Sequence, residues 1–343
     1  MKLKYIINLM TCLVVLFSAC GSKTSKEEDN SEITAERHTP HLGGKAIEIG
    51  KPPKPSDELQ DLIDETVPHF RQHIYVNDKG DSLQYNIFAP EIIFPGRKYP
   101  LVLFMADATT PGPDPLIPLI RGYGGLVWAA PEFQEKHPCY VVVPQYSYIT
   151  VNDSWQTMPE VDETIELINH LTSKFSIDTD RLYATGQSMG GMMAMYFNIK
   201  YPDLFAASIF VSCQWDVKEM KGFNDKKFIY ITAQDDHKAT SCADALKALL
   251  KKENSTFRQA TWSAKLPEEE QDKLATNLLD KKCPRNFITF EGSSVLPPDG
   301  KGMVHMASFD YAYKLSPVRD WLLQQSKPHK DAEGYDIDGN DNE

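Results

Sequence analysis

The residues best placed to do chemistry form the run from Leu182 to Gly191, in which an apolar stretch leads into Gly-Gln-Ser-Met-Gly. A serine hydroxyl is a weak nucleophile unless it is exposed beside a base, and a sharp strand-to-helix turn exposes Ser188 in this way. Such a turn leaves little room two positions either side of the serine, where Gly186 and Gly190 stand. The run predicts a nucleophilic serine; the alternative is a small-residue turn that packs a helix on a sheet.

On a fold with this kind of turn, an acid and then a histidine should follow the serine, each after a strand. Of nine histidines, those that follow it are His237, His305 and His329. His329 lies in a polar tail and His237 abuts a candidate acid. His305 comes after the last strand-like run and before a helical stretch over residues 308–324. We predict that His305 is the base; the alternative is a loop histidine that caps the last helix.

Two carboxylates are candidates for the acid. The apolar run from Phe228 to Ile231 is followed by Thr-Ala-Gln-Asp-Asp-His, so Asp235 and Asp236 stand at the same strand end. A carboxylate there can fix the tautomer of the imidazole and stabilise the imidazolium formed during acyl transfer. Either aspartate could reach His305, and the one that does not would cap the following helix.

Backbone N–H groups are expected to hold the oxyanion, because they are fixed in place before charge develops. One donor should be Met189, directly after the serine, and the second should come from the loop that follows the strand over residues 101–105. We predict Ala108 as this second donor. Gln187, Asp107 and Trp215 are candidates for substrate binding. Trp262 could also line a pocket, although an aromatic residue in a covering segment is more often part of the core.

The elements that must position these residues alternate between strand and helix. Alternation of this kind favours an α/β fold with a mostly parallel sheet covered by helices on both faces. An antiparallel hairpin is expected at its start, around Asn77–Asp81. The expected strands are residues 101–105, 140–143, 182–185, 206–211, 228–231 and 287–290.

Both ends of the chain differ from this pattern. Residues 1–19 have a basic start, an apolar run and then Ser18-Ala19-Cys20, which is typical of an export signal and resembles a bacterial lipobox in which Cys20 becomes lipidated. Phe17 departs from that pattern, so cleavage to a secreted protein is the alternative. Residues 20–56 are predicted to be a polar tether, 57–326 the catalytic domain, and 327–343 a disordered acidic tail.

Composition excludes some classes of function. The chain has 343 residues and a formal net charge of −12, which argues against nucleic acid as a partner. No spacing of Cys and His predicts a zinc site, so we expect neither a metal nor a cofactor. Cys242 and Cys283 flank the segment over residues 251–284 and could pair in an oxidising compartment.

Taken together, four segments resemble the α/β-hydrolase superfamily, and within it the exported esterases grouped with polyhydroxybutyrate depolymerases, feruloyl esterases and predicted peptidases. They are Tyr99–Phe104, Ile177–Tyr183, Thr185–Gly191 and Val318–Leu323. The resemblance favours Asp236 over Asp235, because related hydrolases place the acid a few residues into the loop. The chain departs from the usual His-Gly pair of the oxyanion loop at Ala106 and Asp107.

The resemblance implies a serine esterase, anchored by lipid in the bacterial cell envelope, which removes acetyl or feruloyl groups from plant polysaccharide or cleaves a small-molecule ester. A peptidase would use the same catalytic residues. A glycan-binding lipoprotein on an inactive hydrolase fold is the alternative from another class, and the ordered set of Ser188, Asp236 and His305 argues against it. Whether residues 251–284 form a lid is left open.

Overall fold

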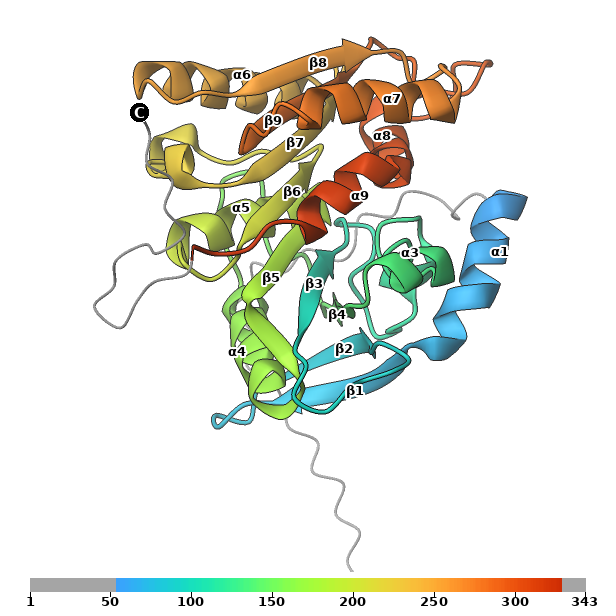
Figure 1. Ribbon diagram of the computed structural model, residues 1–343, viewed down its shortest axis with the longest axis vertical. Coiled ribbons are helices and arrows are strands. Elements are labelled where there is room, and N and C mark those ends of the chain that lie inside the picture. The colour runs from blue at the N-terminus through green and yellow to red at the C-terminus, as the bar shows by residue number, and fades with distance from the viewer. Residues whose placement is uncertain (1–53, 329–343) are drawn as a thin grey trace, which may run out of the picture. The chain divides into compact units, whose positions relative to one another are not determined.

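A nine-stranded sheet organises residues 54–328, which are the part of the chain that the computed structural model describes (Figure 1). The strand order is β1-β2-β4-β3-β5-β6-β7-β9-β8. The strands are β1 (Arg71–Val76), β2 (Ser82–Phe88), β3 (Tyr99–Met105), β4 (Tyr140–Gln145), β5 (Ile177–Gln187), β6 (Ala207–Val211), β7 (Phe228–Ala233), β8 (Arg258–Trp262) and β9 (Arg285–Phe290).

The pairing explains the sequence pattern of the strands. β1 pairs antiparallel with β2, and β2 with β4, whereas the pairs from β4 through to β8 are parallel. Every residue of β3, β4, β6 and β7 is buried, as expected for parallel strands that helices cover on both faces. The predicted α/β class and the antiparallel hairpin at its start are confirmed.

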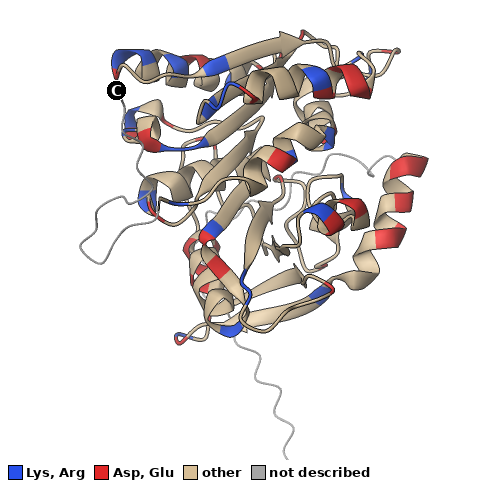
Figure 2. Cartoon of the chain, in the orientation of Figure 1, with Lys and Arg blue, Asp and Glu red and all other residues tan. Residues whose placement is uncertain are grey.

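Helices form a layer on each face of the sheet (Figure 1). One apolar cluster joins the sheet to α1, α3, α7, α8 and α9, and the other joins it to α4, α5 and α6. The charged side chains lie mostly on helices and loops, and the central strands carry few of them (Figure 2). The helices are α1 (Asp57–Thr66), α2 (Ile117–Ile120), α3 (Pro131–Lys136), α4 (Pro159–Lys174), α5 (Met189–Lys200), α6 (His237–Lys252), α7 (Glu268–Leu279), α8 (Val304–Lys314) and α9 (Ser316–Leu323).

The segment over residues 251–284 is part of this framework and not a lid. It contains β8, which pairs in parallel with β9 at the edge of the sheet, and α7, which packs in the core beneath it. Trp262 ends β8, is buried, and donates its indole N–H to Gln271 at 3.3 Å, so it is a core residue. Cys242 and Cys283 are both free thiols, so the suggested disulfide is absent from the described structure.

The final helical stretch also differs from the prediction. Two helices, α8 and α9, occupy it, and the break falls at Leu315, two residues before Pro317. Proline cannot donate a backbone hydrogen bond, so a helix readily starts at this point. Because α8 begins at Val304, His305 lies in the first helical turn and not in the preceding loop.

The predictions for the ends of the chain fall mainly on residues outside the described range. These are the export signal over 1–19, lipidation at Cys20, most of the tether over 20–56 and most of the acidic tail over 327–343. None of the helices in residues 54–328 is long and apolar enough to cross a bilayer.

Candidate active site

Ser188 occupies the junction between β5 and α5, in a backbone conformation that L-residues rarely adopt. Its φ is 50° and its ψ is −118°. The turn is tight, because a Cβ on Gly190 would lie 1.9 Å from the carbonyl oxygen of Met105, and one on Gly186 would lie 2.4 Å from the carbonyl carbon of Gly190. These glycines let the chain turn against the end of β3, and the turn leaves Ser188 partly exposed.

Three side chains from distant segments meet at this junction. His305 Nε2 lies 2.9 Å from Ser188 Oγ, and His305 Nδ1 lies 2.7 Å from Asp236 Oδ2. A carboxylate only accepts hydrogen bonds, so Nδ1 carries the proton of the neutral imidazole and Nε2 accepts from the serine hydroxyl. This arrangement allows His305 to take the proton of Ser188 as the oxygen attacks.

Of the two adjacent carboxylates, the structure brings Asp236 to the histidine. Asp236 ends the turn after β7, where its N–H donates to the carbonyl of Ala233 at 3.0 Å. Its side chain is 7% exposed, whereas Asp235 is exposed to solvent. Asp236 is also the residue that precedes α6, so the expectation that Asp235 caps this helix is wrong.

The position of His305 depends on hydrogen bonds at the start of α8. Ser308 donates its hydroxyl to the carbonyl of His305 at 2.7 Å, and its oxygen lies 2.6 Å from the hydroxyl of Ser212, which follows β6. The imidazole also meets the edge of Phe309 in a T-shaped contact with 5.1 Å between ring centroids. These contacts join the histidine to the end of the sheet beside Ser188.

The two predicted oxyanion donors come from neighbouring elements, one from the start of α5 and one from the turn after β3. Met189 is the first residue of α5, so its N–H has no acceptor inside the helix. Ala108 lies in the turn after β3, and within residues 54–328 its N–H makes no hydrogen bond. Both donors are therefore available to an anionic oxygen.

Asp107 and Gln187, which we predicted to bind substrate, are bonded to each other. Gln187 donates from Nε2 to Asp107 Oδ2 at 2.9 Å, and the side chains are only 5% and 2% exposed. The other oxygen of Asp107 accepts from the N–H and the hydroxyl of Thr109, at 2.9 and 2.6 Å. The pair links the turn that carries Ala108 to the residue before the nucleophile.

Cysteine thiols near the site are not suited to act as nucleophiles. Cys213 packs where a side chain on Gly191 would lie, and its burial raises the pKa of its thiol well above the usual range. Burial likewise raises the pKa of the Cys242 thiol. Both groups stay protonated at neutral pH, and a thiol reacts as the thiolate. In the described part of the chain no group of His, Cys, Asp and Glu side chains is arranged to hold a metal ion.

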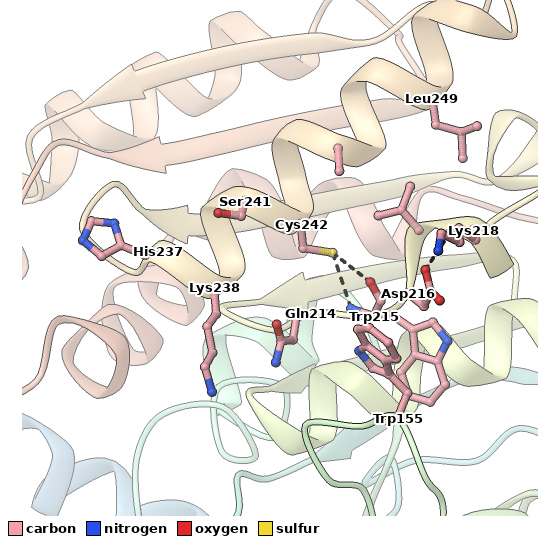
Figure 3. Close-up of a pocket in the computed structure, with 12 residues that line it drawn as sticks. Trp155, Gln214, Trp215, Asp216, Lys218, His237, Lys238, Ser241, Cys242 and Leu249 are labelled. Atoms are coloured by element: carbon pink, nitrogen blue, oxygen red, sulfur yellow. Dashed lines mark hydrogen bonds between the residues drawn. The ribbon is translucent and has the colours of Figure 1, made fainter.

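A pocket of about 730 Å³ lies between the segment after β6 and the helix α6, and Ser188, Asp236 and His305 are not among the residues that line it (Figure 3). Trp215, which we predicted to bind substrate, is among the lining residues; it is 3% exposed, and its indole N–H donates to Glu219 at 2.9 Å. Trp155, which sequence reasoning missed, also lines the pocket and is 39% exposed. The Asn-Asp-Ser sequence before Trp155 indicates a turn, but it does not say where the ring lies.

Comparison with known proteins gives a family match over part of the chain. Residues 152–258, fewer than half of the total, match the prolyl oligopeptidase family. The matched region includes Ser188 and Asp236 and ends before His305. No curated protein matches the sequence.

Solved structures share the fold. A thermostable esterase is 23% identical with a TM-score of 0.61, and the match covers 77% of this chain and 64% of that one. A feruloyl esterase module from Clostridium thermocellum, solved as a mutant with sinapinate, is 13% identical with a TM-score of 0.52, and the match covers 84% of this chain and 98% of that one. The protein therefore has an α/β-hydrolase fold.

Proposed function

We propose that the protein is a serine esterase that hydrolyses carboxylic esters through an acyl-enzyme, with Ser188, His305 and Asp236 as its catalytic residues. The observation that carries the proposal is the continuous relay from Ser188 Oγ to His305 Nε2 at 2.9 Å and from His305 Nδ1 to Asp236 Oδ2 at 2.7 Å. A protein that only bound ligands would have no need of this relay on a strained serine.

In the acylation step, Ser188 Oγ attacks the ester carbonyl while its proton passes to His305 Nε2. The carbonyl oxygen becomes anionic and accepts hydrogen bonds from the N–H groups of Met189 and Ala108. When the intermediate collapses, the bond to the alcohol oxygen breaks and the imidazolium gives that oxygen its proton. Asp236 stabilises the imidazolium throughout these transfers.

In the deacylation step, water replaces the alcohol. His305 takes a proton from the water as its oxygen attacks the acyl carbon, and the same oxyanion donors stabilise the second intermediate. Collapse breaks the bond to Ser188 Oγ, which regains its proton from His305. The products are one carboxylic acid and one alcohol, and the enzyme returns to its starting state.

A peptidase is the second candidate, and the match to the prolyl oligopeptidase family favours it. The catalytic residues would be the same in both cases. We favour an ester because an alkoxide leaves with less help from a general acid than an amine does. The chain shares its fold with esterases, among them a feruloyl esterase module. This supports testing acetyl and feruloyl esters as the first substrates.

A panel of substrates tests the proposal. Wild-type protein and Ser188→Ala should be compared on p-nitrophenyl acetate, methyl ferulate, acetylated xylan and a chromogenic peptide. Turnover of an ester that depends on Ser188 supports the esterase, whereas peptide cleavage that depends on Ser188 would establish the peptidase. A fluorophosphonate probe that fails to label folded wild-type protein would argue for a glycan-binding protein without catalytic activity.

The enzyme is proposed to be attached to the bacterial envelope through a lipid on Cys20, as the first 20 residues indicate. Metabolic labelling with an alkyne fatty acid tests this location. The label should be incorporated into wild-type protein and be absent from Cys20→Ser. Release of unlabelled wild-type protein into the medium would instead support a secreted enzyme.

A further inference from the structure

One edge of the sheet is open to solvent. β1 is the first strand in the strand order, and within residues 54–328 no strand pairs with its outer side (Figure 1). Five of its six residues are exposed, among them Ile74 at 63% and Val76 at 59%. An edge strand with unpaired backbone groups and exposed aliphatic side chains can pair with another strand, so soluble proteins usually protect such edges.

The opposite edge of the sheet is protected in this way. β8 exposes the polar residues Arg258, Gln259 and Thr261, whereas its aromatic residue Trp262 is buried. Charged and polar side chains at an edge discourage the addition of a further strand. Of the two edges in the described part of the sheet, β1 is therefore the one that is suited to accept a strand.

The hydrogen bonds of the first hairpin determine which backbone groups face the open side. The Asn77 N–H donates to the Asp81 carbonyl at 2.9 Å, so Asn77 directs its N–H toward β2. In an antiparallel pair, residues that bond to the partner strand alternate with residues that point away from it. Gln72, Ile74 and Val76 therefore direct their N–H and C=O groups away from β2, toward the open side.

The spacing of these three residues allows two copies of β1 to pair with each other. When Ile74 of one copy lies opposite Ile74 of a second copy, Gln72 lies opposite Val76, and each of these pairs exchanges two backbone hydrogen bonds. A two-fold axis at Ile74 relates the copies, which is the commonest symmetry of homodimers. The Ile74 and Val76 side chains of both copies then form one apolar stripe on the same face of the joined sheet.

Charges at the two ends of β1 are complementary in the same register. Arg71 lies opposite Asn77 of the second copy, on the same face of the joined sheet. The Asn77 amide donates to the carboxylates of Asp81 at 3.3 Å and Glu166 at 3.0 Å. Arg71 itself is exposed and forms no ion pair with any residue in 54–328. Each guanidinium would thus meet two carboxylates of the other copy, and symmetry supplies this contact twice.

We propose that the protein forms a two-fold symmetric dimer in which the β1 strands of two copies pair antiparallel. Ile74 lies at the axis, and Arg71 of each copy binds the carboxylates around Asn77 of the other. The occupant of the open edge is thus a second copy of this chain. Pairing over six residues makes a small interface, so the dimer should be weak, with a Kd on the order of 10 to 100 µM.

The dimer is independent of the proposed esterase. In the strand order, β2, β4 and β3 separate β1 from β5, whose end leads to Ser188. Each copy therefore keeps its own complete set of candidate catalytic residues. Dimerisation should leave hydrolysis unchanged, and a chain that hydrolyses no ester should still dimerise.

Sedimentation velocity of the full-length chain tests the dimer, with Cys20→Ser as the background so that no lipid can be attached. This protein should show a monomer–dimer equilibrium that depends on its concentration. Ile74→Lys places two ammonium groups opposite each other at the axis and should raise the Kd at least about tenfold. Ile92→Lys is a matched control, because Ile92 is 62% exposed in the loop between β2 and β3; its Kd should equal that of the background.

A pair of charge-reversal variants tests the register. In Arg71→Glu alone and in Glu166→Lys alone, self-pairing brings like charges together, so both variants should dimerise more weakly than the background. In a mixed dimer with one copy of each variant, both contacts join opposite charges. The Kd of an equimolar mixture should therefore return to within about threefold of the background value.

Four results would refute the dimer. They are a monomer at every concentration up to about ten times the expected Kd, a dimer of equal strength in Ile74→Lys, an equal weakening in Ile92→Lys, and a mixture that dimerises no better than its two components. Assembly that grows without limit would contradict the two-fold axis, because such an interface closes after two copies.

Discussion

Replacing Asp107 with alanine tests how the proposed oxyanion donors are positioned. The Asp107 carboxylate accepts three hydrogen bonds, two from Thr109 and one from Gln187, and the residue is 2% exposed. Asp107→Ala leaves the buried amide of Gln187 without its acceptor, at a cost of about 1 to 3 kcal/mol, and releases the turn that carries Ala108. The free energy of unfolding should therefore fall by about 2 to 4 kcal/mol in total.

The effect on catalysis should exceed this general loss of stability. If the released turn no longer presents the Ala108 N–H, kcat should fall by roughly 100-fold or more, the usual cost of one lost oxyanion donor, with little change in KM. Kinetics on p-nitrophenyl acetate and urea unfolding of the same samples measure both quantities. Asp107→Asn keeps an acceptor for Thr109, so its kcat should fall much less.

Two controls make the reasoning refutable. In the double variant Asp107→Ala, Gln187→Ala no buried amide is left unpaired, so its loss of stability should be about 1 to 2 kcal/mol smaller than the sum of the single losses. Additive losses would show that the bond between the two side chains contributes nothing. A wild-type kcat in folded Asp107→Ala would refute the role of Asp107 in holding Ala108 in place.

Three further predictions test other parts of the site and its surroundings. Gly190→Ala should lower the free energy of unfolding by about 3 kcal/mol or more, because its Cβ would lie 1.9 Å from the Met105 oxygen; Gly80→Ala, with nothing within 4 Å, should lose only about 1 kcal/mol in the same urea titration. Asp236→Ala should fold normally by circular dichroism and lose about 10⁴-fold in kcat; a loss under tenfold would refute its role. Burial raises the pKa of the Asp310 carboxyl, so its charged form destabilises the fold. Asp310→Asn should then stabilise the protein at pH 7, and this gain should shrink as the pH falls and vanish below about pH 4, where the unfolded carboxyl is also protonated. A gain that is independent of pH would contradict this cause.

Sequence patterns predicted the strands and turns whose formation depends on residues close together in the chain. Parallel strands are buried on both faces, so β3, β6 and β7 appear in the sequence as short apolar runs. The tight turn at Ser188 could be predicted from the sequence because only glycine fits at positions 186 and 190. By contrast, β8 at the sheet edge buries little except Trp262, and its pattern did not distinguish a strand from a covering segment.

Contacts between distant segments account for what the sequence did not predict. The Asp107 side chain could point to substrate or to Gln187. The outcome depends on a contact between two residues that are 80 positions apart in the chain. The place of Trp155 depends on Asp153 meeting Gln214 and Lys238, which lie 61 and 85 residues further along the chain. The residue types were visible in each case, but their partners are set by the strand order, which a single sequence does not reveal.

The path of the chain through the site has a consequence for how activity appears during folding. His305 is separated by 117 residues from Ser188 and by 69 from Asp236, and the C-terminal segment fastens onto β5 where Tyr183 donates its hydroxyl to the carbonyl of Gln325 at 2.5 Å. Contacts this far apart in sequence form late, because their loop-closure entropy must be overcome first. Recovery of hydrolysis after dilution from urea should therefore lag behind recovery of helical circular dichroism. A nascent chain whose residues 305–325 are still inside the ribosome would lack the contact between His305 and Ser188.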